Sequence, residues 1–167
     1  RLGRLPILPT LDAETLAYIL DFGEAKVLIV DRELLPLAQK VLQQTKQKPL
    51  LILIDDETAL QKPDVELEVK HYEELIISGD PEFSCPPLED EWQALSLNYT
   101  SGTTGKPKGV VYHHRGAYLM SMGTAAGWEL PNHPRYLYCV PMFHCNGWCH
   151  VWTMTLLAAT VVCMRAF

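Results

Sequence analysis

Glycines, hydroxyl side chains and lysines are concentrated in residues 99–109, whose sequence is YTSGTTGKPKG. This segment holds three glycines, four serine or threonine hydroxyls and two lysines, and it lies between two apolar runs. Glycine lets backbone N–H groups approach a ligand closely, and successive N–H groups in such a turn form a concave anion site. Each charge-assisted hydrogen bond to a phosphate oxygen contributes on the order of 1.5–3 kcal/mol. The composition therefore favours a loop that binds a polyphosphate.

Other interpretations of this loop are weaker. A flexible hairpin with solvated lysines has a similar composition, but no acid lies between residues 94 and 127, which favours an anionic ligand. A Walker A loop is excluded, because the fifth residue after Gly102 is Pro107 where that motif has glycine. The dinucleotide-binding pattern G-x-G-x-x-G is absent from the sequence as well.

The elements that must position this loop alternate between helices and short aliphatic strands. Helical patterns lie in residues 12–22, 34–44, 72–77, 113–127 and 146–158. Strand patterns lie in residues 26–31, 49–55, 94–99, 109–112, 136–140 and 160–164. Asp12 is placed to cap the first helix and Gly23 to end it. The runs at 26–31 and 49–55 are almost wholly aliphatic, which is typical of buried parallel strands. The sequence therefore predicts an α/β fold with a mostly parallel sheet flanked by helices.

Charge and hydropathy exclude several classes of function. The chain has 167 residues and a net charge of −6. Residues 1–93 carry 9 Lys/Arg and 19 Asp/Glu, whereas residues 94–167 carry 5 Lys/Arg and a single acid. The acidic first part argues against general nucleic-acid binding, and the basic second part is compatible with a phosphate ligand. The longest nearly apolar run, residues 151–164, is shorter than the ~20 residues that a membrane-spanning helix needs.

The cysteines and histidines have two interpretations. Five cysteines without regular spacing indicate a reduced, intracellular protein. His144, Cys145, Cys149 and His150 would allow a zinc site, but structural zinc sites normally use two separated pairs of ligands. We therefore expect no metal here, and we expect the cysteines to pack as small buried residues. The neighbouring histidines at 113 and 114 are expected in a solvated turn.

Longer motifs identify a family. Residues 97–109 (LNYTSGTTGKPKG) resemble the signature of the adenylate-forming, AMP-binding enzymes, and residues 141–148 (PMFHCNGW) resemble the next motif of that family. Residues 11–20 and 24–31 resemble its N-terminal region, so that the similarity spans residues 11–167. The form of the second motif is most similar to short- and medium-chain acyl-CoA synthetases and plant-type acyl-activating enzymes. Residues 1–10 are atypical of the family.

The resemblance implies a reaction and a role for the loop. In this family a carboxylic acid attacks the α-phosphate of Mg-ATP, and a thiol, usually that of coenzyme A, then displaces AMP. The glycine-rich loop holds the β- and γ-phosphates, where donors stabilise the charge that develops on the leaving pyrophosphate. Lys108 and Thr104 would act in catalysis, and Lys106 occupies a variable motif position. The implied phosphate-binding residues are Thr100, Ser101, Gly102, Thr103, Thr104, Gly105, Lys106 and Lys108.

The second motif implies an acyl pocket. His144 matches a family residue beside the reacting carboxylate, and Phe143 and Trp148 would form a wall of the same pocket. His144 is not assigned as a general base, because a carboxylate loses no proton when it attacks. The implied small-molecule partners are a carboxylic acid, ATP and coenzyme A, with Mg²⁺ as cofactor.

The family's later motifs, which surround the adenine, ribose and magnesium, are not found in this sequence. We therefore expect a partial N-terminal domain, inactive alone, of a longer protein that is here called the parent. Two alternatives stay open: an adenylation domain that loads a carrier-protein thiol, and a phosphate-binding module without catalysis.

Overall fold

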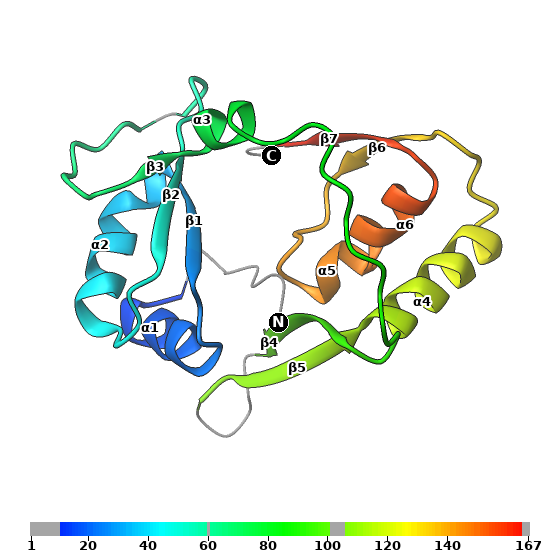
Figure 1. The fold of residues 1–167 in the computed structure, drawn as a ribbon, viewed down its shortest axis with the longest axis horizontal. Helices are drawn as coiled ribbons and strands as arrows, with labels where there is room; N and C mark the ends of the chain where they lie inside the picture. Colours follow the sequence, from blue (N-terminus) through cyan, green and yellow to red (C-terminus); the bar gives the residue numbers. More distant parts are fainter. Residues whose placement is uncertain (1–10, 60, 101–105, 165–167) are drawn as a thin grey trace. The chain divides into compact units, whose positions relative to one another are not determined.

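The computed structural model describes residues 11–59, 61–100 and 106–164. Contacts between Cα atoms divide these residues into two units. The N-terminal unit comprises residues 11–87, except residue 60, together with residues 106 and 107. The C-terminal unit comprises residues 88–100 and 108–164. The two units are described separately below, with the labels of Figure 1.

The N-terminal unit is a small α/β layer (Figure 1). Its helices are α1 (Ala13–Phe22), α2 (Leu35–Gln44) and α3 (Tyr72–Ile77), with a short 3-10 helix at Arg32–Leu34. The Asp12 carboxylate accepts a hydrogen bond from Thr15 N at 2.8 Å, and Gly23 N donates to the Ile19 carbonyl at 2.9 Å. Both predicted ends of the first helix are therefore confirmed.

Three parallel strands form the sheet of this unit: β1 (Val27–Asp31), β2 (Leu50–Ile54) and β3 (Lys70–His71). The register pairs Val27 with Leu50 and Asp31 with Ile54. The sequence pattern predicted the first two strands and missed β3, which has only two residues.

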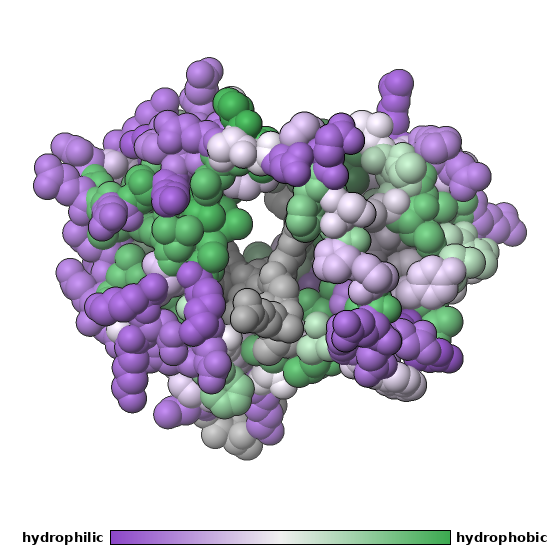
Figure 2. Space-filling view, in the orientation of Figure 1, coloured by the Kyte–Doolittle hydropathy of each residue, from purple (hydrophilic) through white to green (hydrophobic). Residues whose placement is uncertain are grey.

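The prediction that these strands are buried holds for only one of their two faces among the described residues. One face holds the core cluster of Val30, Leu35, Ala38, Leu51 and Leu53. The opposite face is open, with Ile29 52% and Val27 47% exposed, and hydrophobic side chains gather at the surface over β1 and β2 (Figure 2). Side chains alternate along a strand, so helices that cover one face leave every second aliphatic residue at the surface.

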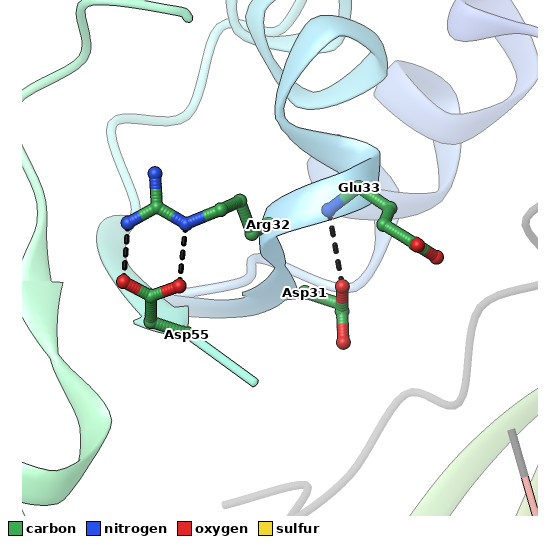
Figure 3. A network of polar contacts seen from close by, with 4 residues as sticks. All are labelled: Asp31, Arg32, Glu33 and Asp55. Carbon is green, nitrogen blue, oxygen red and sulfur yellow. Dashed lines mark hydrogen bonds and ion pairs between the residues drawn. The ribbon is translucent and has the colours of Figure 1, made fainter. Parts of the chain in front are cut away.

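An ion pair joins the carboxyl ends of the two neighbouring strands. Arg32 follows β1 and donates through Nε to Asp55 Oδ1 at 2.5 Å, with a second bond from its Nη2 to Oδ2 (Figure 3). Asp31 accepts from Glu33 N at 3.0 Å and so caps the 3-10 helix. The hydrogen bond with Arg32 holds the pKa of Asp55 below its ordinary value of 3.8.

Asp21 joins α1 to the chain that follows α2. It accepts hydrogen bonds from the Thr45 hydroxyl, from Lys46 N at 2.9 Å and from Gln47 N at 3.1 Å. The hydrogen bond from Thr45 is the largest cause that holds the pKa of Asp21 below its ordinary value of 3.8, and the two backbone bonds act in the same direction. A carboxylate with a lowered pKa stabilises the folded state fully above its ordinary pKa. That stabilisation is lost as the pH falls through the lowered value.

We therefore expect the free energy of unfolding of Asp21→Asn to fall less than that of the native protein as the pH drops below about 4, where an ordinary aspartate carboxylate binds protons. Urea unfolding of the parent at a series of pH values measures this loss. The control is Asp64→Asn, which changes an exposed carboxylate. Equal acid sensitivity of the Asp21→Asn variant and the native protein would contradict the assignment.

The C-terminal unit contains a hairpin, three helical segments and a parallel strand pair. Strands β4 (Ala94–Thr100) and β5 (Lys108–His113) are antiparallel, while β6 (Arg135–Tyr138) and β7 (Thr160–Cys163) are parallel. Helix α4 (His114–Gly127) packs against α6 (His150–Leu156), and α5 (Cys145–Trp148) precedes α6. The fold is thus mixed α/β, and the β4–β5 hairpin is its antiparallel part.

His113 ends β5 and caps α4. Its Nδ1 accepts from Gly116 N at 3.0 Å, and its ring lies 4.8 Å from that of Trp92. Arg115 pairs with Glu91 at 2.5 Å and lies over the Trp92 ring at 5.7 Å. The expectation of a solvated turn at His113 is wrong, because the ring is needed for the helix N-terminus.

Among the helices of the described ranges, none has the length and apolar character that a bilayer crossing requires.

Candidate functional site

The β4–β5 hairpin brings two predicted phosphate-binding residues together. Its register pairs Tyr99 with Gly109 and Thr100 with Lys108, at the ends of the strands that the glycine-rich loop connects. Directly paired residues of antiparallel strands project on the same face, with Cβ atoms roughly 4.5–5.5 Å apart. Both Thr100 and Lys108 are exposed. The Cβ atoms of a hydroxyl residue and of a lysine are therefore neighbours on one face at the ends of these two strands.

The middle of the loop is outside the described residues. This applies to Ser101, Gly102, Thr103, Thr104 and Gly105. Their predicted roles in holding phosphate, and that of Thr104 in catalysis, stay predictions.

Lys106 has a neighbour that the sequence did not suggest. Its Nζ lies 5.1 Å from the centre of the Tyr18 ring, and that ring stacks on Phe22 at 5.7 Å. An ammonium group over an exposed aromatic face contributes about 0.5–1 kcal/mol. Lys106 is also followed by Pro107, which restricts the backbone before it to extended conformations. This contact gives Lys106 a structural partner, and its predicted phosphate contact stays a prediction.

The predicted acyl-pocket residues occupy a sharply bent segment. His144 is exposed, Phe143 is half-buried, and Trp148 is 56% exposed. The Trp148 ring lies 6.1 Å from that of Trp128. The His144 carbonyl accepts from Gly147 N at 2.9 Å, which closes the turn between the two predicted pocket residues.

This segment is a left-handed helical turn. The φ angles are 48° at Cys145, 49° at Asn146, 57° at Gly147, 62° at Trp148 and 59° at Cys149. The left-handed conformation costs L-residues roughly 1–2 kcal/mol each, so five consecutive examples, of which only one is glycine, require strong support from their surroundings. The prediction of one continuous helix over residues 146–158 is wrong: the regular helix starts at His150 and ends at Leu156.

The glycine in this turn is sterically required. A Cβ atom at Gly147 would lie 2.5 Å from Tyr138 Cε1 and 2.9 Å from the Tyr138 hydroxyl oxygen. Such distances are far below van der Waals contact. Gly147 therefore allows both the left-handed φ and the close approach of strand β6.

The cysteines do not pack in the core. The side chains of Cys85, Cys139, Cys145 and Cys163 are exposed, and Cys149 is half-buried, so the prediction of buried packing is wrong. The described ranges contain no cluster of three His, Cys, Asp or Glu side chains that could hold a metal ion.

A polar pair between the buried His150 and the half-buried Tyr136 lies at the end of the turn, and sequence reasoning missed it. His150 Nδ1 lies 2.6 Å from the Tyr136 hydroxyl, and the two rings meet edge to face with centres 5.1 Å apart. The Trp128 ring also meets the His150 ring edge to face, with centres 5.1 Å apart. The sequence offered one signal, the aromatic residues crowded between 128 and 152, and these were interpreted only as core.

Burial controls the charge of these groups. Desolvation lowers the pKa of His150 below its ordinary value of 6.5, which keeps the imidazole neutral near pH 7. Burial also raises the pKa of Tyr136, and it raises that of Tyr138 to about 12. The pair is therefore a neutral hydrogen bond rather than an ion pair.

Comparison with known proteins gives the family of this chain. A family model described as "AMP-binding enzyme" matches residues 4–167. The acetate–CoA ligase CCL3 of Humulus lupulus is 44% identical over 166 residues, which cover 93% of this chain and 29% of that protein. The peroxisomal butyrate–CoA ligase AAE11 of Arabidopsis thaliana is 45% identical over 170 residues, covering 96% and 29%.

Solved structures share the fold. A long-chain-fatty-acid–CoA ligase of Archaeoglobus fulgidus superposes with a TM-score of 0.76 at 28% identity, over 95% of this chain and 30% of that one. An anthranilate–CoA ligase crystallised with anthranoyl-AMP gives a TM-score of 0.77 at 23% identity, over 96% and 30%. The chain thus spans under a third of the length of these proteins. Because the family model matches nearly every residue, the chain belongs to the AMP-binding enzyme family.

Proposed function

We propose that this chain is part of a longer acid–thiol ligase that activates a carboxylic acid with ATP. A carboxylate oxygen attacks the α-phosphorus, the bond to the β-phosphate oxygen breaks, and pyrophosphate leaves. The sulfur of coenzyme A then attacks the acyl carbon, its thiol proton is released to solvent, and AMP leaves with the bonding electrons. The observation that supports this function best is the pairing of Thr100 with Lys108 at the mouth of a glycine-rich loop in a chain of this family.

The roles of the residues follow from charge. Negative charge accumulates on the pyrophosphate as its bond to the α-phosphorus breaks. The Lys108 ammonium and the Thr100 hydroxyl would stabilise that charge, together with the donors of residues 101–105. Donors that the fold already holds in position need not reorganise during the reaction. Contacts that strengthen as this charge develops raise the rate more than equally strong contacts with the bound acid.

The acid substrate is proposed to be short. Relatives at 44% and 41% identity are named as acetate–CoA and acetate/butyrate–CoA ligases. Phe143, His144 and Trp148 would line the acyl site, with an indole and a phenyl ring against the chain of the acid.

We further propose that the parent works in the cytoplasm or the peroxisome, since two of the similar ligases are named as peroxisomal.

Magnesium would accompany ATP as in the rest of the family. The described residues hold no three-carboxylate or histidine cluster for it, so no step is assigned to the metal here.

The test is a reaction of the purified full-length parent with ATP, coenzyme A and a series of straight-chain acids. We expect AMP and an acyl-CoA thioester in equal amounts, both dependent on the acid. Transfer to a carrier-protein thiol instead of coenzyme A would favour the carrier-loading alternative. ATP binding without any AMP formation would favour the phosphate-binding module and contradict the proposal.

Trp148 supplies a prediction about selectivity. Trp148→Ala enlarges the proposed acyl site, so the preferred acid should become longer, while the KM for ATP stays unchanged. Each methylene is worth about 1–3 kcal/mol, and the shift along a series of acids should therefore be graded. Measuring kcat/KM for each acid gives the profile. An unchanged profile, or a matching rise of the KM for ATP, would contradict the placement of Trp148 at the acyl site.

A further inference from the structure

The left-handed turn at residues 145–149 needs support from outside itself. Four of its five consecutive positive-φ residues are L-amino acids in a conformation that they rarely adopt. The turn contains Trp148 and directly follows His144, two of the proposed acyl-site residues. The contacts that stabilise the turn therefore also set the positions of these acyl-site residues.

Strand β6 provides the support at two points. Tyr138 lies against Gly147, so closely that no Cβ fits between them. Tyr136, two residues earlier on the same strand, bonds His150 Nδ1 at 2.6 Å directly after the turn. His150 is 4% exposed, and its ring contacts those of Tyr136 and Trp128. Trp128 also contacts Trp148, so the same indole touches the turn and the residue that follows it.

The two tyrosines differ in one respect. The Tyr136 hydroxyl has a buried partner, whereas the Tyr138 hydroxyl makes no hydrogen bond within the part of the chain that the structure describes. Removing a bonded hydroxyl leaves a buried polar group without a partner, which is costly, while removing an unbonded one is close to neutral. The same Tyr→Phe change should therefore be costly at position 136 and close to neutral at position 138.

We propose that Tyr136 is a positioning residue for the acid substrate, acting through its hydrogen bond with His150. The bond fixes the first residue of α6 against β6, which holds the end of the left-handed turn and thereby the placement of Trp148 and His144. Tyr136 itself touches no substrate in this arrangement. The inference rests on the proposed function, because it concerns the acyl site of that reaction.

The experiment compares Tyr136→Phe with Tyr138→Phe in the full-length parent, with acetate and butyrate as acids. We expect Tyr136→Phe to raise the KM for the acid about fivefold to thirtyfold, which corresponds to about 1–2 kcal/mol. The KM for ATP should not change, and Tyr138→Phe should alter neither value. Melting temperatures are recorded for both variants, since a purely structural role would lower stability without separating the two KM values.

A second variant tests the coupling. His150→Phe keeps a ring against Trp128 but removes the nitrogen that bonds Tyr136. In that background Tyr136→Phe should have no further effect on the KM for the acid. If Tyr136→Phe cannot be obtained folded, His150→Phe alone should reproduce the rise in the KM for the acid.

Several results would overturn the inference. These are an unchanged KM for the acid in Tyr136→Phe, equal rises for acid and ATP, an additive effect in the double variant, or failure of both single variants to fold. Wild-type parent that forms no AMP with any acid contradicts the proposed function instead, and the inference falls with it. Active wild type with an unaffected Tyr136→Phe contradicts the inference alone.

Discussion

Replacing Gly147 by alanine should be among the most damaging single changes in the C-terminal unit. The alanine must adopt a backbone φ of 57°, and its Cβ would lie 2.5 Å from Tyr138 Cε1. Left-handed strain of roughly 1–2 kcal/mol and overpacking of roughly 1–3 kcal/mol together predict a loss of about 2–5 kcal/mol in the free energy of unfolding. Because the turn leads into the proposed acyl site, acid-dependent activity of the parent should fall as well. Denaturant unfolding and acid kinetics of the variant measure both effects.

Gly123→Ala is the matched control. Gly123 lies in α4, where an added Cβ meets no atom within 4 Å. The same substitution there should stabilise the protein by about 0.4–1 kcal/mol, because alanine is the better helix former and restricts the unfolded chain. A Gly147→Ala variant as stable as the native protein would show that the left-handed turn is not required.

Lys108→Ala should weaken the use of ATP more than any other lysine change in this chain. Loss of a charge-assisted contact of about 1.5–3 kcal/mol corresponds to a fall of roughly 10–150-fold in kcat/KM for ATP. The KM for the acid should change little, because Lys108 is assigned to the leaving pyrophosphate. Steady-state kinetics of the full-length parent with ATP as the varied substrate provide the measurement.

Lys106→Ala serves as the comparison for Lys108. The two lysines are two residues apart and both exposed, but Lys106 lies over Tyr18 whereas Lys108 pairs with Thr100. Loss of a cation–π contact of about 0.5–1 kcal/mol should lower kcat/KM for ATP by roughly fivefold or less. Equal effects at both positions, or none at Lys108, would contradict the distinction.

Much of the fold could be predicted because local patterns and tertiary contacts agree. In α1 the helical spacing of Leu16, Ile19 and Leu20, the Asp12 cap and the Gly23 terminus are all found in the structure. Strands β1 and β2 were evident from their aliphatic runs. The two-residue strand β3 could not be found, since so short a segment has no periodicity of its own.

The left-handed turn is the clearest failure of the sequence pattern. Residues 146–158 have the composition of a helix, and nothing local favours positive φ except Gly147 and Asn146. The conformation depends on Tyr138, Tyr136 and Trp128, which lie at least seven residues away in the chain. Sequence windows do not contain such contacts. The exposed faces of β1 and β2 were missed for a related reason, because aliphatic composition does not tell which faces are covered.

The candidate site was found from composition and motif together. The many hydrogen-bond donors of residues 99–109 predicted a phosphate loop. The register of β4 with β5 places Thr100 and Lys108 on the same face of the hairpin. The Tyr136–His150 pair could not be predicted, since its members are fourteen residues apart and each alone is an ordinary core residue.

The central claim is that the glycine-rich loop and the ends of its hairpin hold the phosphates of ATP. A crystal structure of the full-length parent with ATP or a non-hydrolysable analogue tests it directly. We predict that the Lys108 ammonium and the Thr100 hydroxyl lie within hydrogen-bond distance of the β- or γ-phosphate oxygens. A triphosphate bound elsewhere, with Thr100 and Lys108 facing solvent, would contradict the account.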